Sequence, residues 1–245
     1  MSGRVERIGG ATLYLGDALE IMPTLGTVAH IIGDPAYEQI MHDAKASGRA
    51  LRTDGGPELQ PLNFASIDEI REPFVAIAAT MCAGWFIMFC TPEGVARWAD
   101  AINPSPMRYK RACVWVKPDA TPQMNGQGPA AGAENFVVAW AGTGFSRWNA
   151  GGKRGVYTHL TNNVERTGLH PTEKPRRLMA EIIADFTCAG ETILDPFMGS
   201  GTTGVAAVML GRPFIGIEQN ETYFDLACKR LDQAQRQGSL FGEAA

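Results

Sequence analysis

The chain has 245 residues, of which 45% are apolar and 20% are charged, and its formal net charge is −4 at pH 7. This composition is typical of a globular protein, and it excludes a disordered chain, a collagen and a disulfide-stabilised miniprotein. The length fits a single α/β domain, and the five cysteines contain no C-x-x-C pair, so we expect a reduced protein without a zinc cluster.

Seven short apolar runs predict the strands of one sheet. Most of them are apolar throughout, which is typical of parallel strands that helices cover on both faces. Helix-like segments lie between them at Phe74–Met81, Pro175–Thr187, Thr203–Leu210 and Glu221–Gln235. This alternation predicts an α/β fold with a Rossmann-like, doubly wound and mostly parallel sheet. The predicted strands are Thr12–Gly16, His30–Gly33, Trp85–Cys90, Ala112–Val116, Phe136–Trp140, Thr192–Leu194 and Pro213–Ile217.

Two features bear on the cellular location. The first residues, Met1–Gly10, lack the apolar core of a signal peptide, so nothing predicts export. The stretch Pro73–Pro92 carries no charge and is long enough to suggest a membrane span. Ala83-Gly84 divides it into a helix-like half and a strand-like half, which predicts a buried helix followed by a buried strand. We therefore expect a soluble, cytoplasmic protein.

A glycine-rich turn, Asp195-Pro-Phe-Met-Gly-Ser-Gly-Thr-Thr-Gly204, follows one predicted strand and begins a helix. Its glycines satisfy the G-x-G-x-x-G pattern that lets a backbone approach a nucleotide cofactor. Glu218 ends the next strand, where a carboxylate can hold ribose hydroxyls. Asp195 would repel a pyrophosphate but attract an ammonium group. These features favour S-adenosylmethionine over a nicotinamide dinucleotide, while a dehydrogenase and a turn without a ligand stay open as alternatives.

A second turn, Asp34-Pro-Ala-Tyr37, directly follows the predicted strand His30–Gly33, where open α/β sheets bind ligands. With His170-Pro-Thr-Glu-Lys174-Pro175 and the glycine turn, it resembles the β-class DNA amino-methyltransferases, in which a D-P-P-Y motif precedes the cofactor glycines. Leu15–Glu20 and Val114–Pro118 extend the resemblance over most of the chain. It implies a seven-stranded methyltransferase sheet in circularly permuted order. Such an order agrees with the short part of the chain that follows the glycine turn.

The resemblance assigns Asp34, Pro35 and Tyr37 to catalysis. The Asp34 carboxylate and the Pro35 carbonyl oxygen can each accept one N–H of a base amine, which frees the lone pair of the nitrogen. The base must be flipped out of the duplex, and Tyr37 offers a ring that can stack on it. This chemistry requires no metal ion. Ala36 stands where the family usually has a second proline, so a slower or inactive member stays open.

The resemblance also implies which residues hold the cofactor. Asp195 faces the methionine amino group, the glycine turn faces the methionine carboxylate, and Glu218 takes the ribose. Asp17 contacts the adenine, and the segment His170–Pro175 forms a lid, although its residues alone also fit a simple helix start. The implied cofactor-binding residues are Asp17, His170, Thr172, Lys174, Asp195, Phe197, Gly199, Ser200, Gly201, Thr202, Thr203 and Glu218.

Basic residues gather in one segment of this otherwise acidic chain. Between Ser105 and His170 there are eight Lys or Arg and three Asp or Glu residues. We interpret residues 119–169, which are rich in Gly, Pro, Asn and Gln, as a small insert that recognises double-stranded DNA. A solvated charged face is the alternative interpretation. The candidate DNA contacts are Arg147, Lys153 and Arg154, with Arg49 and Arg52 after the Asp34–Tyr37 turn.

Residues 237–245 are predicted to form a flexible tail. Its sequence Gln237-Gly-Ser-Leu-Phe241 resembles the peptide by which bacterial DNA enzymes dock on the sliding clamp. A frayed tail with two apolar residues is the alternative, because short motifs often match by chance. The sequence also leaves a homodimer open.

Together these patterns predict a bacterial or phage enzyme, associated with the nucleoid and typical of restriction–modification, that methylates DNA from S-adenosylmethionine. Aspartate at the first motif position favours adenine N6 over cytosine N4 by family habit. An RNA or protein-amide methyltransferase of the same chemistry stays open, as does a non-catalytic DNA-binding relative.

Overall fold

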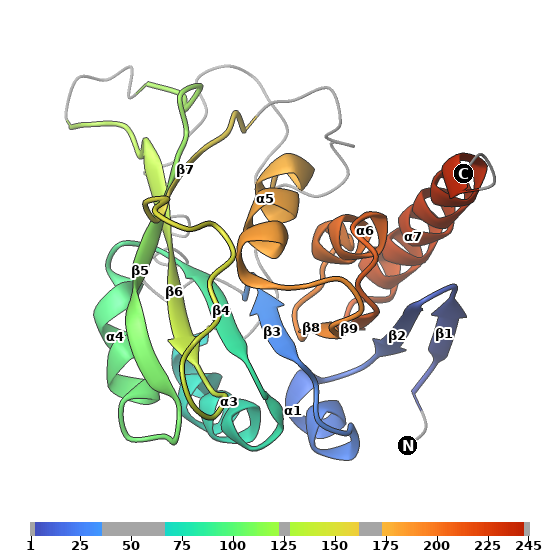
Figure 1. The fold of residues 1–245 in the computed structure, drawn as a ribbon, viewed down its shortest axis with the longest axis horizontal. Coiled ribbons are helices and arrows are strands. Elements are labelled where there is room, and N and C mark those ends of the chain that lie inside the picture. Colours follow the sequence, from blue (N-terminus) through green and yellow to red (C-terminus); the bar gives the residue numbers. More distant parts are fainter. Residues whose placement is uncertain (1–2, 36–66, 123–127, 162–172, 243–245) are drawn as a thin grey trace.

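The computed structural model describes residues 3–35, 67–122, 128–161 and 173–242, the last five of these by their backbone alone. Their strands form one nine-stranded sheet (Figure 1). The strands are β1 (Val5–Ile8), β2 (Ala11–Leu15), β3 (His30–Gly33), β4 (Trp85–Cys90), β5 (Arg108–Val116), β6 (Ala133–Trp140), β7 (Val156–Thr158), β8 (Ile193–Asp195) and β9 (Phe214–Glu218). Their spatial order is β1-β2-β9-β8-β3-β4-β6-β5-β7.

Helices cover both faces of this sheet. In β4, alternate side chains belong to two separate apolar clusters, one with α5, α6 and α7 and the other with α1, α3 and α4. This explains why the strand is apolar throughout, since neither of its faces meets water. The helices are α1 (Ala18–Ile21), α3 (Ile67–Met81), α4 (Gly94–Ile102), α5 (Arg176–Phe186), α6 (Thr202–Met209) and α7 (Glu221–Gly242), with a 3₁₀ turn η1 (Met22–Thr24) after α1.

The strand directions decide which residues meet. The neighbouring strands β2, β9, β8, β3 and β4 run parallel, so their carboxyl ends share one edge, which we call the carboxyl edge. β6 is antiparallel to β4 and therefore begins at this edge, whereas β5 is antiparallel to β6 and ends at it. Segments far apart in the sequence thus converge there, and the opposite side of the sheet is the amino edge.

All the predicted strands are present, and the predicted helices correspond to α3, α5, α6 and α7. The sheet has two strands more than predicted, β1 and β7. Both are short, partly exposed strands at the borders of the sheet, so neither forms a fully apolar run in the sequence. The predicted insert 119–169 contains β6 and β7, so these parts of it belong to the central sheet. α7 continues to Gly242, so the beginning of the predicted tail is helical.

The uncharged stretch that suggested a membrane span divides as predicted. Its first half is the end of α3, and its second half is β4, whose side chains are all buried. Among the helices of the described residues, none is long and apolar enough to cross a membrane.

Candidate active site

Asp34 and Asp195 lie close together at the carboxyl edge. Asp34 follows the last residue of β3, Asp195 is the last residue of β8, and these strands pair in parallel. Gly33 permits the close approach, since a Cβ atom at this position would lie 3.1 Å from Asp195 Oδ1. Two neighbouring strands therefore lead into carboxylates at the edge where open α/β sheets bind ligands.

The Asp34 carboxylate is paired with a lysine from the segment before α5. Lys174 Nζ lies 2.7 Å from Asp34 Oδ2, and the same ammonium lies 2.7 Å from Glu134 Oε1. Burial raises the pKa of Asp34 to about 6, although the charge of Lys174 opposes this rise. At neutral pH the carboxylate is thus mainly ionised, and it can take up a proton only slightly below neutrality. Pro35, the next residue, is buried.

Asp195 is a buried carboxylate that meets neutral donors. Its side chain is almost inaccessible to water, and burial raises its pKa to about 7. The backbone N–H of Phe197 donates a hydrogen bond to Oδ1 at 3.0 Å, and the Thr203 hydroxyl donates another. No cation within the described ranges forms an ion pair with it. Such a carboxylate fits a ligand that carries an ammonium group, because the ligand would supply the missing charge.

The glycine turn between β8 and α6 packs tightly against α7. Gly199 and Gly201 have φ values of 51° and 82°, in the left-handed region that favours glycine. A Cβ atom on Gly201 would lie only 2.9 Å from the Cβ of Ala227 on α7. The turn therefore requires glycine both for its conformation and for its packing. The predicted residues Ser200, Thr202 and Thr203 are all buried in it.

Glu218 connects the end of β9 to this turn. Its Oε2 accepts a hydrogen bond from the backbone N–H of Gly199 at 3.0 Å, and its Oε1 accepts one from the N–H of Asn220 at 2.7 Å. Burial raises the pKa of this carboxyl group, since 8% of the residue is exposed. The carboxylate is thus held rigidly beside the glycine turn, and its remaining lone pairs suit hydroxyl groups.

Asp17 lies at the same edge. It follows β2, which pairs in parallel with β9, and the neighbouring Gly16 donates its N–H to the Glu218 carbonyl oxygen at 2.9 Å. Asp17 also caps α1, because its Oδ1 accepts the N–H groups of Leu19 and Glu20. Its exposed side chain therefore combines a local structural role with a position next to Glu218.

Arg230 on α7 is a site residue that the sequence analysis missed. Its Nη1 donates to the carbonyl and hydroxyl oxygens of Ser200, each at 2.8 Å, and to Thr202 Oγ1 at 3.2 Å. Its Nη2 pairs with Glu173 at 2.6 Å, so one guanidinium ties the glycine turn to the segment before α5. The only sequence signal is a position next to Leu231 on the apolar stripe of the helix, which does not by itself indicate a ligand site.

The remaining predicted cofactor and catalytic residues divide into two groups. The Phe197 ring packs against Phe74 of α3, with 5.1 Å between ring centroids. Tyr37, His170 and Thr172 lie outside the described residues.

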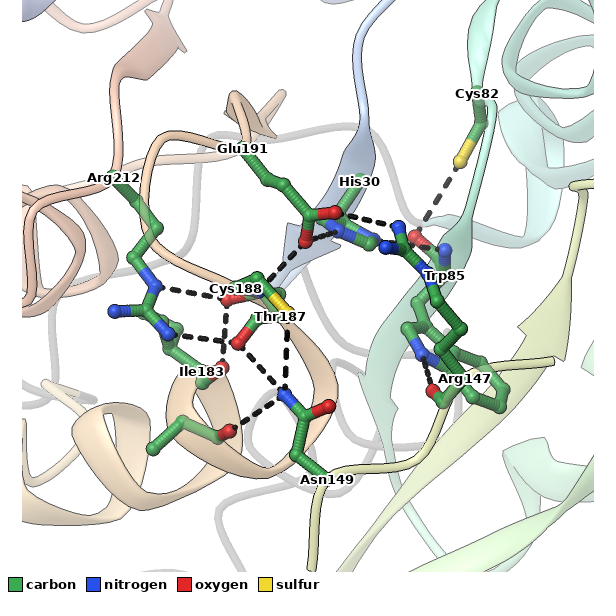
Figure 2. Close-up of polar contacts among 11 residues, drawn as sticks. His30, Cys82, Trp85, Arg147, Asn149, Ile183, Thr187, Cys188, Glu191 and Arg212 are labelled. Carbon is green, nitrogen blue, oxygen red and sulfur yellow. Dashed lines mark hydrogen bonds and ion pairs between the residues drawn. The ribbon is translucent and has the colours of Figure 1, made fainter.

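The structure describes three of the five candidate DNA-binding residues, and their surroundings differ. Arg147 lies at the amino edge, where its guanidinium is 2.5 Å from Glu191 and its carbonyl oxygen accepts the indole N–H of Trp85 (Figure 2). Lys153 forms ion pairs with Glu181 and Asp185 of α5. Arg154 is exposed, and Arg49 and Arg52 lie outside the described residues. The site at the carboxyl edge thus includes neither Arg147 nor Lys153.

Comparison with protein families gives one match that spans most of the chain. The family model described as DNA methylase (N6_N4_Mtase) matches residues 28–229. Among curated proteins, the type II methyltransferase M2.DpnII of Streptococcus pneumoniae is 54% identical over 74 residues, which is 30% of this chain and 28% of that protein. M2.LlaDCHI of Lactococcus lactis subsp. cremoris is 48% identical over 80 residues, 32% of this chain and 30% of that protein. The chain therefore matches less than a third of the length of either relative.

Solved structures match over a larger share of the chain. The M1.HpyAVI–SAM complex has a TM-score of 0.70 and 28% identity, and the match covers 91% of this chain and 99% of that one. The cytosine-N4-specific PvuII DNA methyltransferase has a TM-score of 0.67 at 15% identity, with 95% and 92% of the two chains covered, and this likeness shows the fold alone. The predicted α/β methyltransferase fold with a large central sheet is confirmed.

Proposed function

This chain belongs to the DNA methylase family, and from that premise we propose that it transfers a methyl group from S-adenosylmethionine to an exocyclic amine of a flipped-out base in duplex DNA. The observation that carries the proposal is the meeting of Asp34 and Asp195 at the carboxyl edge, with Glu218 on the adjoining strand β9. One carboxylate suits the base amine, and the other suits the amino group of the cofactor.

The residues at this edge fit S-adenosylmethionine by the chemistry of their side chains. Asp195 offers a buried carboxylate for the amino group, and Glu218 offers lone pairs for the ribose hydroxyls. Asp17 stands on the side of Glu218, where the adenine would lie, and the glycine turn begins α6, whose N-terminal amides suit a carboxylate. S-adenosylmethionine, when bound, supplies a methyl group activated by a positively charged sulfur. The lid residues His170, Thr172 and Lys174 complete the proposed set.

Asp34 and Pro35 act on the base amine. Their oxygens accept hydrogen bonds from the two N–H groups. The nitrogen lone pair is then no longer delocalised into the ring and faces the methyl group. As the N–C bond forms, the bond between the methyl carbon and the cofactor sulfur would break and leave a neutral thioether. The methylated amine becomes acidic, and one of its protons would leave to the Asp34 carboxylate. A carboxyl group with a pKa of about 6 can accept this proton and then release it to water at neutral pH. Tyr37 is the proposed stacking residue for the flipped base.

The experiment is the transfer of labelled methyl groups from S-adenosylmethionine to unmethylated duplex DNA, with RNA and heat-denatured DNA as separate arms. Asp34→Asn removes the charge and keeps the shape, so we expect at least a hundredfold loss of transfer. Affinity for S-adenosylmethionine should change less than about threefold, because Asp34 is not a proposed cofactor ligand. Equal transfer by the variant and the wild type, with both folded, would refute the assignment of Asp34.

Adenine N6 is the proposed target atom, and cytosine N4 is the alternative. The aspartate in the Asp34-Pro-Ala-Tyr37 turn supports adenine through its resemblance to the adenine-type motif. The likeness to a cytosine-N4-specific enzyme is limited to the fold, so it does not favour cytosine. The identity of the methylated nucleoside decides between them.

Contacts with further partners are also proposals. Arg49, Arg52 and Arg154 are the proposed phosphate contacts of the duplex, which would associate the protein with the nucleoid. Gln237–Phe241 is the proposed sliding-clamp peptide, although α7 extends over this segment. Deletion of Gly238–Ala245 should then abolish co-elution with the clamp while methyl transfer continues, and unchanged co-elution would refute it. Sedimentation of the protein alone tests the proposed homodimer.

A further inference from the structure

A row of alternating positive and negative side chains leads from the sheet to Asp34. Lys117 Nζ lies 2.7 Å from Glu134 Oε2, Glu134 Oε1 lies 2.7 Å from Lys174 Nζ, and Lys174 Nζ lies 2.7 Å from Asp34 Oδ2. Lys117 follows the end of β5, and Glu134 lies near the beginning of β6. The antiparallel pairing of these strands brings both residues to the carboxyl edge, because Trp115 pairs with Glu134 in the register.

The two central side chains of this row, Glu134 and Lys174, are almost inaccessible to water. The Lys174 side chain is 5% exposed and the Glu134 side chain 6%, whereas 19% of the Lys117 side chain is exposed. The ammonium of Lys174 also lies 4.9 Å from the centre of the Phe89 ring. A buried ammonium without partners would be very unfavourable, so the carboxylates of Asp34 and Glu134 together fix its position.

We propose that Glu134 is a positioning residue that holds the Lys174 ammonium on Oδ2 of Asp34, so that the other oxygen of Asp34 remains as the acceptor for the base amine. The inference rests on the proposed function and deepens it. Lys174 thereby acts as the counter-ion of the catalytic carboxylate, in addition to the proposed cofactor contact that its motif implies. Glu134 lies outside every motif that carried the family resemblance.

The arrangement has an electrostatic consequence that a purely structural ion pair lacks. The charged groups that face Asp34 are Lys174, Glu134 and Lys117, with Asp195 on the neighbouring strand. Lys174 lowers the pKa of Asp34, and Glu134 raises it, partly because it shares the ammonium. Loss of the charge of Lys174 should therefore raise the pKa of Asp34, whereas loss of the charge of Glu134 should lower it.

The test is a carboxyl titration by NMR on protein with ¹³C-labelled aspartate, with the Asp34 signal assigned from Asp34→Asn. Glu134→Gln removes the charge but keeps an oxygen that can accept a hydrogen bond from Lys174, so it should lower the pKa of Asp34, whereas Lys174→Met should raise it, each by about one unit or more. Glu134→Ala also releases the ammonium, so it should lower the pKa of Asp34 less than Glu134→Gln does, or raise it. Glu191→Gln is the matched control, since Glu191 is also a paired carboxylate, with Arg147 and His30 as partners, but lies at the amino edge. It should leave the Asp34 titration unchanged. This measurement requires neither DNA nor S-adenosylmethionine.

The inference is refuted if Glu134→Ala lowers the pKa of Asp34 as much as Glu134→Gln does, since the charge of Glu134 would then act without holding Lys174, or if Glu134→Gln moves it no more than the control does. If Glu134→Gln fails to fold, Lys117→Gln at the exposed end replaces it, and it should raise the pKa of Asp34, since Lys117 lowers it. An unchanged titration in that variant refutes the inference as well. Failure of the proposed function is distinguishable, because wild-type protein would then transfer no methyl group whatever the titration gives.

Discussion

Asp195 illustrates how a carboxylate proposed to bind a ligand lowers the stability of the unliganded protein. Its buried carboxylate has a pKa of about 7, well above the ordinary value of 3.8. Because its pKa is higher in the folded protein than in the unfolded one, this carboxyl group lowers the free energy of unfolding at any pH at which the unfolded form is ionised. The loss begins near pH 4 and is complete above about pH 7. A bound ammonium group would remove this cost by pairing with the charge.

Asp195→Asn should therefore stabilise the unliganded protein at pH 8 and weaken cofactor binding. We expect a gain of up to about 4 kcal/mol in the free energy of unfolding at pH 8, which disappears near pH 4. Denaturant unfolding at the two pH values measures the first effect, and calorimetric titration with S-adenosylmethionine measures a loss of at least tenfold in affinity. A variant that is less stable at pH 8 and binds the cofactor as before would contradict the role given to Asp195.

At the residue scale, the sequence predicts those site residues that follow a strand directly. Asp34, Asp195 and Glu218 are recognisable because each stands at the end of a short apolar run. Glu134 and Arg230 are not, because their roles depend on strand register and on helix packing. Neither the strand register nor the helix packing can be recognised from the sequence around these two residues.

At the scale of elements, strand β3 is anchored at its amino end by a histidine. The Trp85 N–H donates to His30 Nδ1 at 3.0 Å, and His30 Nε2 lies 2.9 Å from Glu191 (Figure 2). Because Nδ1 accepts this hydrogen bond, the imidazole is neutral and its Nε2–H donates to Glu191. Burial lowers the pKa of His30, although Glu191 opposes this shift. The network joins β3, β4 and the segment before β8 at the edge opposite the site.

The pKa of His30 is lower in the folded protein than in the unfolded one, so the neutral imidazole contributes to stability at a pH above its unfolded-state pKa. This contribution is lost as the pH falls below about 6.5. The melting temperature of the wild type should therefore fall between pH 7.5 and pH 5.5. His30→Gln should show a smaller fall, because it has no imidazole to protonate. Glu191→Gln should show a larger one, because the carboxylate that supports the imidazolium is gone. Identical pH slopes in all three proteins would contradict this account of the amino edge.

The elements themselves are largely predictable, and the exceptions have physical causes. β4 is recognisable because both of its faces are buried, whereas β1 alternates exposed and half-buried residues and β7 has only three residues. α4, which the sequence analysis did not predict, is amphipathic and follows β4 after a short turn. α7 extends past its predicted end because Gly238 does not terminate it.

At the scale of the whole molecule, the sheet separates two kinds of polar chemistry. The carboxyl edge gathers Asp34, Asp195 and Glu218, which are candidates for ligand binding. The amino edge gathers His30, Glu191 and Arg147, whose groups satisfy one another. The basic residues that the sequence groups into one segment are divided between these regions by the fold. Charge counts along a sequence cannot reveal such a division.

Arg147→Gln should therefore leave the affinity for duplex DNA within about twofold of the wild type. Its loss should lower the free energy of unfolding by about 0.5–1 kcal/mol, because the guanidinium is largely exposed while Glu191 is not. Arg154→Gln, at an exposed position, should weaken binding and reduce its salt dependence. Fluorescence anisotropy with a labelled duplex at several salt concentrations measures both. Equal weakening by the two substitutions would contradict the structural role given to Arg147.

The measurement that tests the central claim most directly is nucleoside mass spectrometry. Wild-type protein and Asp34→Asn are incubated with S-adenosylmethionine and unmethylated duplex DNA, and the digested DNA is searched for methylated bases. We predict N6-methyladenine with the wild type and none with the variant. Wild-type protein that binds S-adenosylmethionine but yields neither N6-methyladenine nor N4-methylcytosine would contradict the account.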